Sequence, residues 1–139
     1  MLARFWQNCI QSNIQMKNFL KYSWIILIFF LSSFVTIDDV IRAIKSSDAK
    51  QLSKFFDDTI EITLPEKSNT YSKSQAELVL KDFFTNNVII DFEKIHKGEN
   101  AGSQFIVGRL TTKNGNYRTT IYMKQKGDKQ LLQELRFEK

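Results

Sequence analysis

The feature that most constrains this chain is a stretch of sixteen residues without a charged side chain, from Tyr22 to Ile37. Within it lies the unbroken apolar run Trp24 to Leu31, and two lysines precede it. The run has the length of the hydrophobic region of an export signal, about 7–15 residues, and is short for a membrane span of about 20 residues. We therefore expect residues 1–36 to be a leader and residues 37–139 to be one exported domain.

The details of this leader leave two alternatives open. A signal peptide usually begins a few residues before its basic region, which Met16 provides, so residues 1–15 resemble an over-extended start. Ser33 or Thr36 would precede the cleaved bond, although the small-residue spacing of a cleavage site is poor there. A cleaved leader predicts an extracytoplasmic protein, periplasmic or secreted. A retained leader predicts an inner-membrane anchor and a membrane-tethered assembly component.

The charge of the whole chain overstates how basic the domain is. The net charge is +5, but three of the 20 basic residues, Arg4, Lys17 and Lys21, lie in the leader, so 17 basic residues face 15 acidic ones beyond it. A nearly neutral domain without an arginine-rich motif argues against nucleic acid as a partner. The one cysteine, Cys9, also precedes the domain. We therefore expect no disulfide, no thiol nucleophile, no metal and no other cofactor.

Apolar residues recur at helical spacing in three segments of the domain. Thr36 can cap the first helix, a second short helix follows residues 46–48, and Ser72 opens a capping box before the third. Between the second and third helices, residues 60–64 alternate between apolar and polar side chains, and residues 70–71 predict a short extended piece. The first half of the domain is therefore mainly helical.

From residue 88 onward the sequence predicts four antiparallel strands. Turn compositions separate them at residues 98–102, at Asn114-Gly115 and at Gly127-Asp128. Helices followed by a long meander indicate an α+β domain in which the N-terminal helices pack on the antiparallel sheet.

The turn at Asn114-Gly115 predicts which side chains of its two strands share a face, because a two-residue loop fixes the pairing register. The inner face, expected against the helices, carries Ile106, Gly108, Leu110, Tyr117, Thr119, Ile121 and Met123. The outer face carries Phe105, Val107, Arg109, Arg118, Thr120, Tyr122 and Lys124.

The other two hairpins are assigned with less direct signals. A five-residue loop at residues 98–102 would place Phe92 opposite Gly108, Asp91 beside Arg109, and His96 on the inner face. In the last strand, a regular two-residue loop would turn charged side chains inward, which is costly. We therefore expect an odd-length loop or a bulge, and the side chains that it turns inward are Leu131, Leu135 and Phe137.

Over residues 37–139 the chain resembles domains of the nuclear-transport-factor-2-like (NTF2-like), cystatin-like cone superfamily. The resemblance lies in the order of elements and in the segments IDDVIRAIKSSDAKQLSKFF, SQAELVLKDFF and LLQELRFEK. More narrowly, the chain is similar to small secreted bacterial members classed as domains of unknown function. The resemblance implies a cone, in which a strongly curved sheet wraps around helices and leaves a cavity at its wide end. Such domains include isomerase-like and dehydratase-like enzymes, ligand binders and periplasmic assembly domains.

The superfamily's enzymes use an aspartate, histidine or tyrosine inside the cavity, and the inner positions here are mostly aliphatic. We find no matching constellation and therefore expect no catalytic site. The alternative hypothesis is a cavity enzyme of isomerase or dehydratase type. Its acid–base cluster would consist of His96, the only histidine, together with Tyr117 or Lys94. A lone histidine without neighbouring carboxylates does not predict a metal site.

Two surfaces remain as candidate binding sites. A small apolar ligand in the cavity would contact Tyr71, Phe92, Gln104, Ile106, Leu110, Tyr117, Ile121 and Met123. A second copy in a symmetric dimer, or an envelope protein, would contact Phe105, Val107, Arg109, Arg118, Tyr122 and Leu132 on the outer face. The expectation is an exported, non-enzymatic domain that binds a small apolar ligand or a protein partner.

Overall fold

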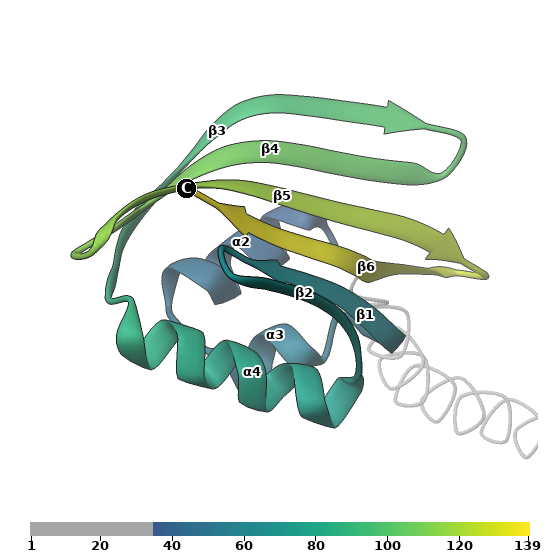
Figure 1. Ribbon diagram of the computed structural model, residues 1–139. Helices are drawn as coiled ribbons and strands as arrows, with labels where there is room; N and C mark the ends of the chain where they lie inside the picture. The colour runs from purple at the N-terminus through teal and green to yellow at the C-terminus, as the bar shows by residue number, and fades with distance from the viewer. Residues whose placement is uncertain (1–34) are drawn as a thin grey trace, which may run out of the picture. The chain divides into compact units, whose positions relative to one another are not determined.

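The computed structural model describes residues 35–139, which form three helices and a six-stranded sheet (Figure 1). The helices are α2 (Ile37–Lys45), α3 (Ala49–Ser53) and α4 (Lys73–Asn86). The strands are β1 (Phe56–Leu64), β2 (Lys67–Ser72), β3 (Ile89–Asn100), β4 (Ser103–Thr112), β5 (Gly115–Lys126) and β6 (Lys129–Glu138). The predicted α+β class is confirmed.

Almost all of the predicted leader, including the proposed start at Met16, lies outside the described residues. Its cleavage or retention therefore stays a prediction. Among residues 35–139, the helices are all too short or too polar to cross a membrane.

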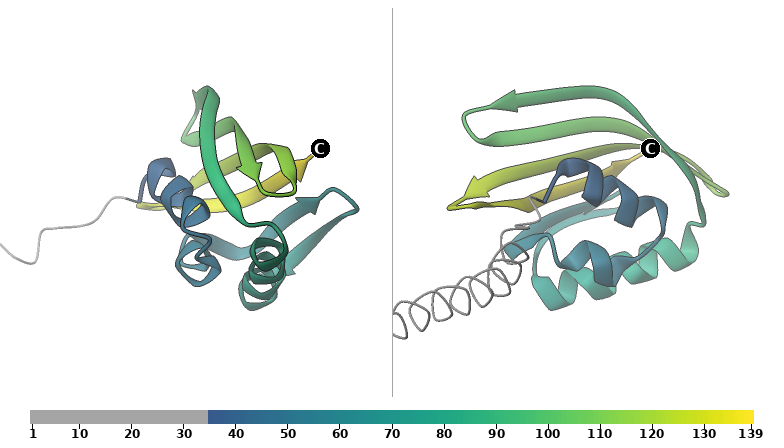
Figure 2. Two further views of the ribbon diagram at one scale, coloured as in Figure 1. Left: turned by 90° about the vertical axis from the view of Figure 1, so that its left-hand side faces the viewer. Right: turned by 180° about the vertical axis from the view of Figure 1, so that it is seen from behind.

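The strands follow the order β2-β1-β6-β5-β4-β3, so the first strand lies beside the last. All neighbours are antiparallel except β1 and β6, which are parallel; the expected purely antiparallel sheet is wrong at this one junction. Such a junction needs a long connection, and here the rest of the domain supplies it. The sheet is curved and the three helices lie on one side of it (Figures 1 and 2).

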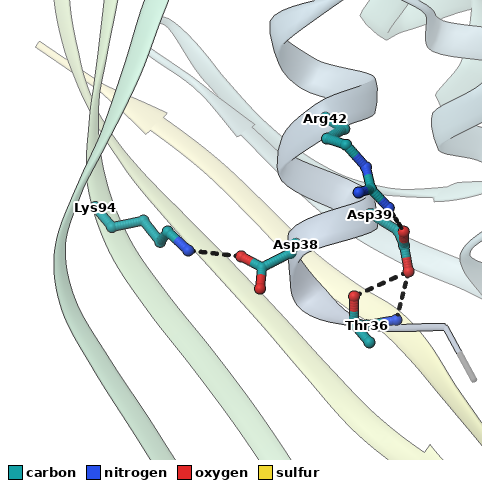
Figure 3. A network of polar contacts seen from close by, with 5 residues as sticks. All are labelled: Thr36, Asp38, Asp39, Arg42 and Lys94. Atoms are coloured by element: carbon teal, nitrogen blue, oxygen red, sulfur yellow. Dashed lines mark hydrogen bonds and ion pairs between the residues drawn. The ribbon is translucent and has the colours of Figure 1, made fainter.

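Both helix starts predicted from capping residues are present. At α2, the Asp39 carboxylate accepts hydrogen bonds from the Thr36 backbone N–H at 2.8 Å and from the Thr36 hydroxyl at 2.9 Å, and it also pairs with Arg42 (Figure 3). At α4, Gln75 reaches back to the backbone N–H of Ser72 at 3.1 Å. These contacts satisfy backbone donors that the first turn of a helix leaves without partners.

The inner face predicted for β4 and β5 is confirmed as the face that packs on the helices. Its aliphatic side chains are completely buried: Ile106, Leu110, Ile121 and Met123. They join apolar residues from all three helices in one core that lies entirely within residues 37–137. The described residues therefore belong to one compact unit with a core of its own.

The β3–β4 hairpin has a shorter loop than expected. Its turn is the two-residue pair Ala101-Gly102, because Asn100 pairs with Ser103. Phe92 consequently pairs with Leu110, and Glu93, not Asp91, lies opposite Arg109. From Asp91 to Lys94 the predicted register is wrong by two residues, which keeps these side chains on their predicted faces, whereas from His96 to Asn100 it is wrong by three.

The Phe92 ring nevertheless covers Gly108, as predicted. A β-carbon on Gly108 would strike the Phe92 ring and lie 2.7 Å from the backbone oxygen of Glu93. Phe92 reaches Gly108 diagonally, from the neighbouring pair of the ladder. A glycine here lets the aromatic ring lie directly on the strand.

A bulge in β3 overturns the predicted position of His96. Lys94 pairs with Gly108 and His96 pairs with Val107, so Ile95 is the extra residue. Because successive side chains of a strand alternate between faces, one extra residue moves His96 from the inner to the outer face. The nearest aromatic ring is that of Phe105, whose centroid is 5.6 Å away.

A second bulge, in β6, corrects the assignment of Leu132. The Gly127-Asp128 loop has two residues, but Tyr122 pairs with Glu134 while Met123 pairs with Leu132, so Gln133 is extra. Leu135 and Phe137 point inward as predicted. Leu132 is also completely buried, so its placement on the partner surface is wrong. The inward position predicted for Leu131 is wrong as well, because Leu131 pairs with Lys124 on the outer face.

The side chain of the bulged Gln133 takes part in a buried polar contact. It donates a hydrogen bond at 3.1 Å to Asp57, which also accepts one from Lys126 Nζ at 2.9 Å and one from the Asp58 backbone N–H at 2.8 Å. The hydrogen bond from Lys126 contributes most to holding the pKa of Asp57 below its ordinary value, and the bonds from Asp58 and Gln133 act in the same direction. The bond with Asp57 also raises the pKa of Lys126. Asp57 therefore links β1 to β5 and β6.

Candidate functional site

The inner face does not form the predicted ligand cavity in this structure. Ile106, Leu110, Ile121 and Met123 have no accessible surface, so they touch neither solvent nor a void as large as a water molecule. Of the other residues predicted to contact the ligand, Phe92 and Tyr117 are buried, while Tyr71 and Gln104 are half-buried. The predicted lining is a packed core, and ligand binding there stays a prediction that requires the core to open.

The three residues considered for acid–base chemistry do not converge. Lys94 donates to Asp38 of α2 at 2.6 Å (Figure 3), and the Tyr117 hydroxyl donates to Asn87 at 2.8 Å. His96 lies on the opposite face of the sheet. Lys94 thus holds α2 against β3, Tyr117 holds the end of α4 against β5, and the arrangement offers no shared reaction centre.

The outer face of β4 and β5 keeps the side chains that the sequence predicted. Phe105, Val107 and Tyr122 are half-buried there, and Arg109 and Arg118 are exposed. Phe105 covers Gly98 of β3, and the Tyr122 hydroxyl donates to Ser103 at 3.0 Å. These aromatic side chains are held by the sheet itself, so the face presents a fixed apolar strip beside two arginines.

A hollow of about 450 Å³ opens on this face where β3 bulges. Side chains that line it come from three strands: Ile95, His96, Val107, Arg109, Asn116 and Arg118. The bulge builds this hollow, because it turns His96 to the outer face and leaves the side chain of Ile95 58% exposed at its edge.

The charges around this hollow are poorly matched. Arg109 and Arg118 are direct cross-strand partners, an arrangement that destabilises a sheet when both side chains carry the same charge. Arg109 pairs with Glu93 at 3.2 Å. Within residues 35–139, no carboxylate approaches Arg118 to ion-pair distance. Glu138 of β6 is the cross-strand partner of Arg118 on its other side but does not reach ion-pair distance, so Arg118 keeps donors that no carboxylate within residues 35–139 occupies.

Comparison with known proteins identifies the family. Residues 37–138 match the family model DUF4783, described as a domain of unknown function. The chain belongs to the DUF4783 family. None of the curated proteins matches it significantly.

Solved structures support both the family and the fold. A DUF4783 protein from Bacteroides ovatus is 30% identical, with a TM-score of 0.71 over 76% of this chain and 94% of that chain. Another, from Bacteroides uniformis, is 28% identical, with a TM-score of 0.72 over 76% and 97%. A protein named for NTF2 is 13% identical, with a TM-score of 0.58 over 73% and 91%, which supports the fold alone. The resemblance to NTF2-like domains is confirmed.

The DUF4783 domain has a second hollow, of about 490 Å³, at the end of α4. Acidic and basic side chains both line it, including Glu66, Asp82 and Lys139. The Lys139 ammonium lies 5.8 Å from the centre of the Tyr117 ring. Its mixed charges favour no single class of ligand, which distinguishes it from the basic hollow on the outer face.

Within residues 35–139 of the DUF4783 domain, histidine, cysteine and carboxylate side chains nowhere gather in a group of three that could hold a metal ion. The sequence placed Arg109, Arg118 and Val107 on the correct face. It did not single out Ile95 and placed His96 on the wrong face, because the bulge at Ile95 has no glycine or proline to announce it.

Proposed function

We propose that this DUF4783 domain acts by protein association and that the outer face of its sheet joins two copies of the chain. The proposal is supported above all by how charge is divided across that face. The outer positions of β4 and β5 carry Arg109, Arg118 and Lys124, whereas those of β6 and β1 carry three glutamates and a single arginine, Glu134, Glu138, Glu61 and Arg136. One half of the face is therefore basic and the other largely acidic.

This division is self-complementary under two-fold symmetry. An axis that runs along the strands between β5 and β6 lays the basic strands of each copy over the acidic strands of the other. Arg118 of one copy then faces Glu138 of the second. The half-buried strip of Phe105, Val107 and Tyr122 supplies apolar contact between the charged pairs, as in the centre of a typical interface.

Sedimentation equilibrium on residues 35–139 tests this association. We expect a reversible dimer that Arg118→Glu weakens by about tenfold or more, because it places two carboxylates face to face. Adding Glu138→Arg to that variant should restore the dimer. Lys50→Glu makes the same charge change on α3 and should leave association unchanged. A strictly monomeric wild-type domain, or equal effects of both lysine and arginine changes, would contradict the proposal.

We also propose that the chain is exported, on the strength of the apolar run from Trp24 to Leu31. Sequencing the amino terminus of the protein isolated from its native cell envelope tests this. A mature start at residues 34–37 would mean a cleaved leader and a free protein. A start before residue 24 in the membrane fraction would mean a retained anchor, and a full-length protein in the cytosol would contradict export.

A further inference from the structure

The hollow at the Ile95 bulge has the features of a small binding site within a single copy of the domain. Its two arginines come from neighbouring strands and lie directly opposite each other. Its third ionisable side chain, His96, reaches the same face only because β3 carries an extra residue. Three side chains that can each donate to an anion thus surround one depression in the sheet.

The rest of the outer face shows how this domain normally compensates an arginine. Arg136 on β6 pairs with Glu134 at 2.7 Å and lies 3.8 Å from Glu138. Arg118 has no such partner within residues 35–139, and Arg109 uses one nitrogen for Glu93. Each guanidinium offers five N–H donors in a planar fork that matches a carboxylate. Glu138 lies opposite Arg118 on β6 without forming an ion pair, so the hollow has guanidinium donors that no carboxylate within residues 35–139 uses.

The walls restrict what kind of anion fits. Ile95 and Val107 line the hollow with branched aliphatic side chains. Glu93 remains beside Arg109 and repels a doubly charged group more strongly than a singly charged one. A monoanion attached to an apolar group satisfies both conditions, whereas a phosphate dianion does not.

We propose that this hollow binds a carboxylate carried on a short apolar group. Arg109 and Arg118 hold the carboxylate, and Ile95 and Val107 contact the apolar part. Asn116 and His96 offer further donors at the rim. The site is complete in one copy and does not require self-association, but the proposed dimer also uses Arg118, so the ligand and the second copy compete for this side chain.

Nuclear magnetic resonance of the ¹⁵N-labelled fragment 35–139 tests the site directly. Hexanoate is the first probe, hexanamide is its neutral counterpart, and inorganic phosphate is the dianion. We expect saturable shifts of the amides of residues 95–96, 107–109 and 116–118 with hexanoate, with a dissociation constant on the order of 1 mM. Hexanamide and phosphate should give much smaller shifts at the same positions. High salt should weaken the binding, because the arginines are exposed.

Matched variants decide whether the arginines carry the binding. Arg118→Gln should weaken hexanoate binding by roughly tenfold, the loss expected for one charge-assisted contact. Arg42→Gln makes the same change on α2, away from the sheet, and should bind as the wild type does. Unchanged spectra elsewhere would show that Arg118→Gln still folds. Absence of saturable shifts, equal shifts with hexanamide, or equal binding by Arg118→Gln would overturn the proposal.

A peptide arm identifies the source of the carboxylate. Acetyl-Leu-Glu-amide carries its only carboxylate on a side chain next to an apolar residue. Tighter binding of this peptide than of hexanoate would assign the hollow to a protein side chain, and the reverse would assign it to a free acid. Both ligands are titrated at a protein concentration at which sedimentation detects only monomer. Ligand binding is then measured separately from self-association.

Discussion

The inner and outer faces of the β3–β6 sheet use similar side chains in opposite ways. On the inner face, Leu110 and Ile121 are completely buried against the helices. On the outer face, Val107 and Tyr122 stay half-buried beside the exposed side chains of Arg109 and Arg118. The domain is thus stabilised from one side of its sheet, and the other side carries apolar and charged groups that the fold does not use. This difference is why the outer face is the candidate for function.

The sharpest way to test this contrast is to truncate one aliphatic side chain on each face. Leu110→Ala should lower the free energy of unfolding by about 2–5 kcal/mol, because it leaves a cavity in a packed core. Val107→Ala should cost less than about 1 kcal/mol, because water can fill the space. Urea unfolding of both variants measures the difference. Equal losses would mean that the outer face is also part of the core.

Two glycines covered by aromatic rings offer a second test of the same contrast. Gly108→Ala should cost about 1–3 kcal/mol, because the new β-carbon meets both the Phe92 ring and the backbone of Glu93. Gly98→Ala meets only the ring of Phe105, which can turn toward solvent, and should cost less. Thermal unfolding of the two variants compares them. A larger loss for Gly98→Ala would show that Phe105 is held rigidly.

Asp57 tests how much a part-buried polar contact between β1, β5 and β6 contributes to stability. Asp57→Asn should lower the free energy of unfolding by about 1–3 kcal/mol at neutral pH, because it removes the charged acceptor of Lys126. Its neighbour Asp58 is exposed, 3.9 Å from the same ammonium, and Asp58→Asn should change stability little. Chemical denaturation at pH 7 distinguishes the two.

The pH dependence of stability gives an independent check on Asp57. Its pKa is lowered in the folded state, first by the hydrogen bond from Lys126, whereas an unfolded aspartate titrates near pH 3.9. The unfolded chain therefore binds the proton more readily, and this stabilisation is complete above about pH 4 and is lost as pH falls through the lowered pKa. Wild-type stability should fall more steeply in acid than that of Asp57→Asn. Parallel curves would contradict this assignment.

The smallest expected effect concerns the arginine without an ion-pair partner. Arg118→Gln should change the free energy of unfolding by no more than about 0.5 kcal/mol at low or high salt, because it removes both the repulsion from Arg109 and the attraction of Glu138. Urea unfolding at two salt concentrations measures this effect. A substantial loss would make Arg118 a structural residue and would weaken its assignment to a binding site.

The sequence predicted the faces of β4 and β5 correctly because one local signal was decisive. Asn114-Gly115 forms the two-residue turn that its composition favours, and pairing from that turn outward is regular from Thr112 to Ser103. Helix starts were also predictable, since Thr36 and Ser72 act through residues three positions away.

Bulges account for the three residues that were assigned to the wrong face, His96, Leu131 and Leu132. His96 and Leu132 each lie next to an extra residue, Ile95 or Gln133, and neither of those is a residue type that marks a bulge. The burial of Leu135 and Phe137 was predictable, because the alternative would have placed charges in the core. The position of the bulge was not, since it depends on contacts such as that between Gln133 and Asp57. The candidate site includes His96, whose face is set by the bulge at Ile95, so this part of the site was not predictable from the sequence.

The parallel pairing of β1 with β6 has a consequence for when this domain can form. Phe55 accepts a hydrogen bond from the backbone of Leu132 at 2.7 Å, across 77 positions of chain. Until the last ten residues have arrived, the β1–β2 ribbon has no central strand to join and the apolar sides of α3 and α4 stay uncovered. Closing so long a loop is slow, which keeps a nascent chain open until its synthesis is nearly finished. A polypeptide that must thread through a narrow channel before it collapses would benefit from that delay.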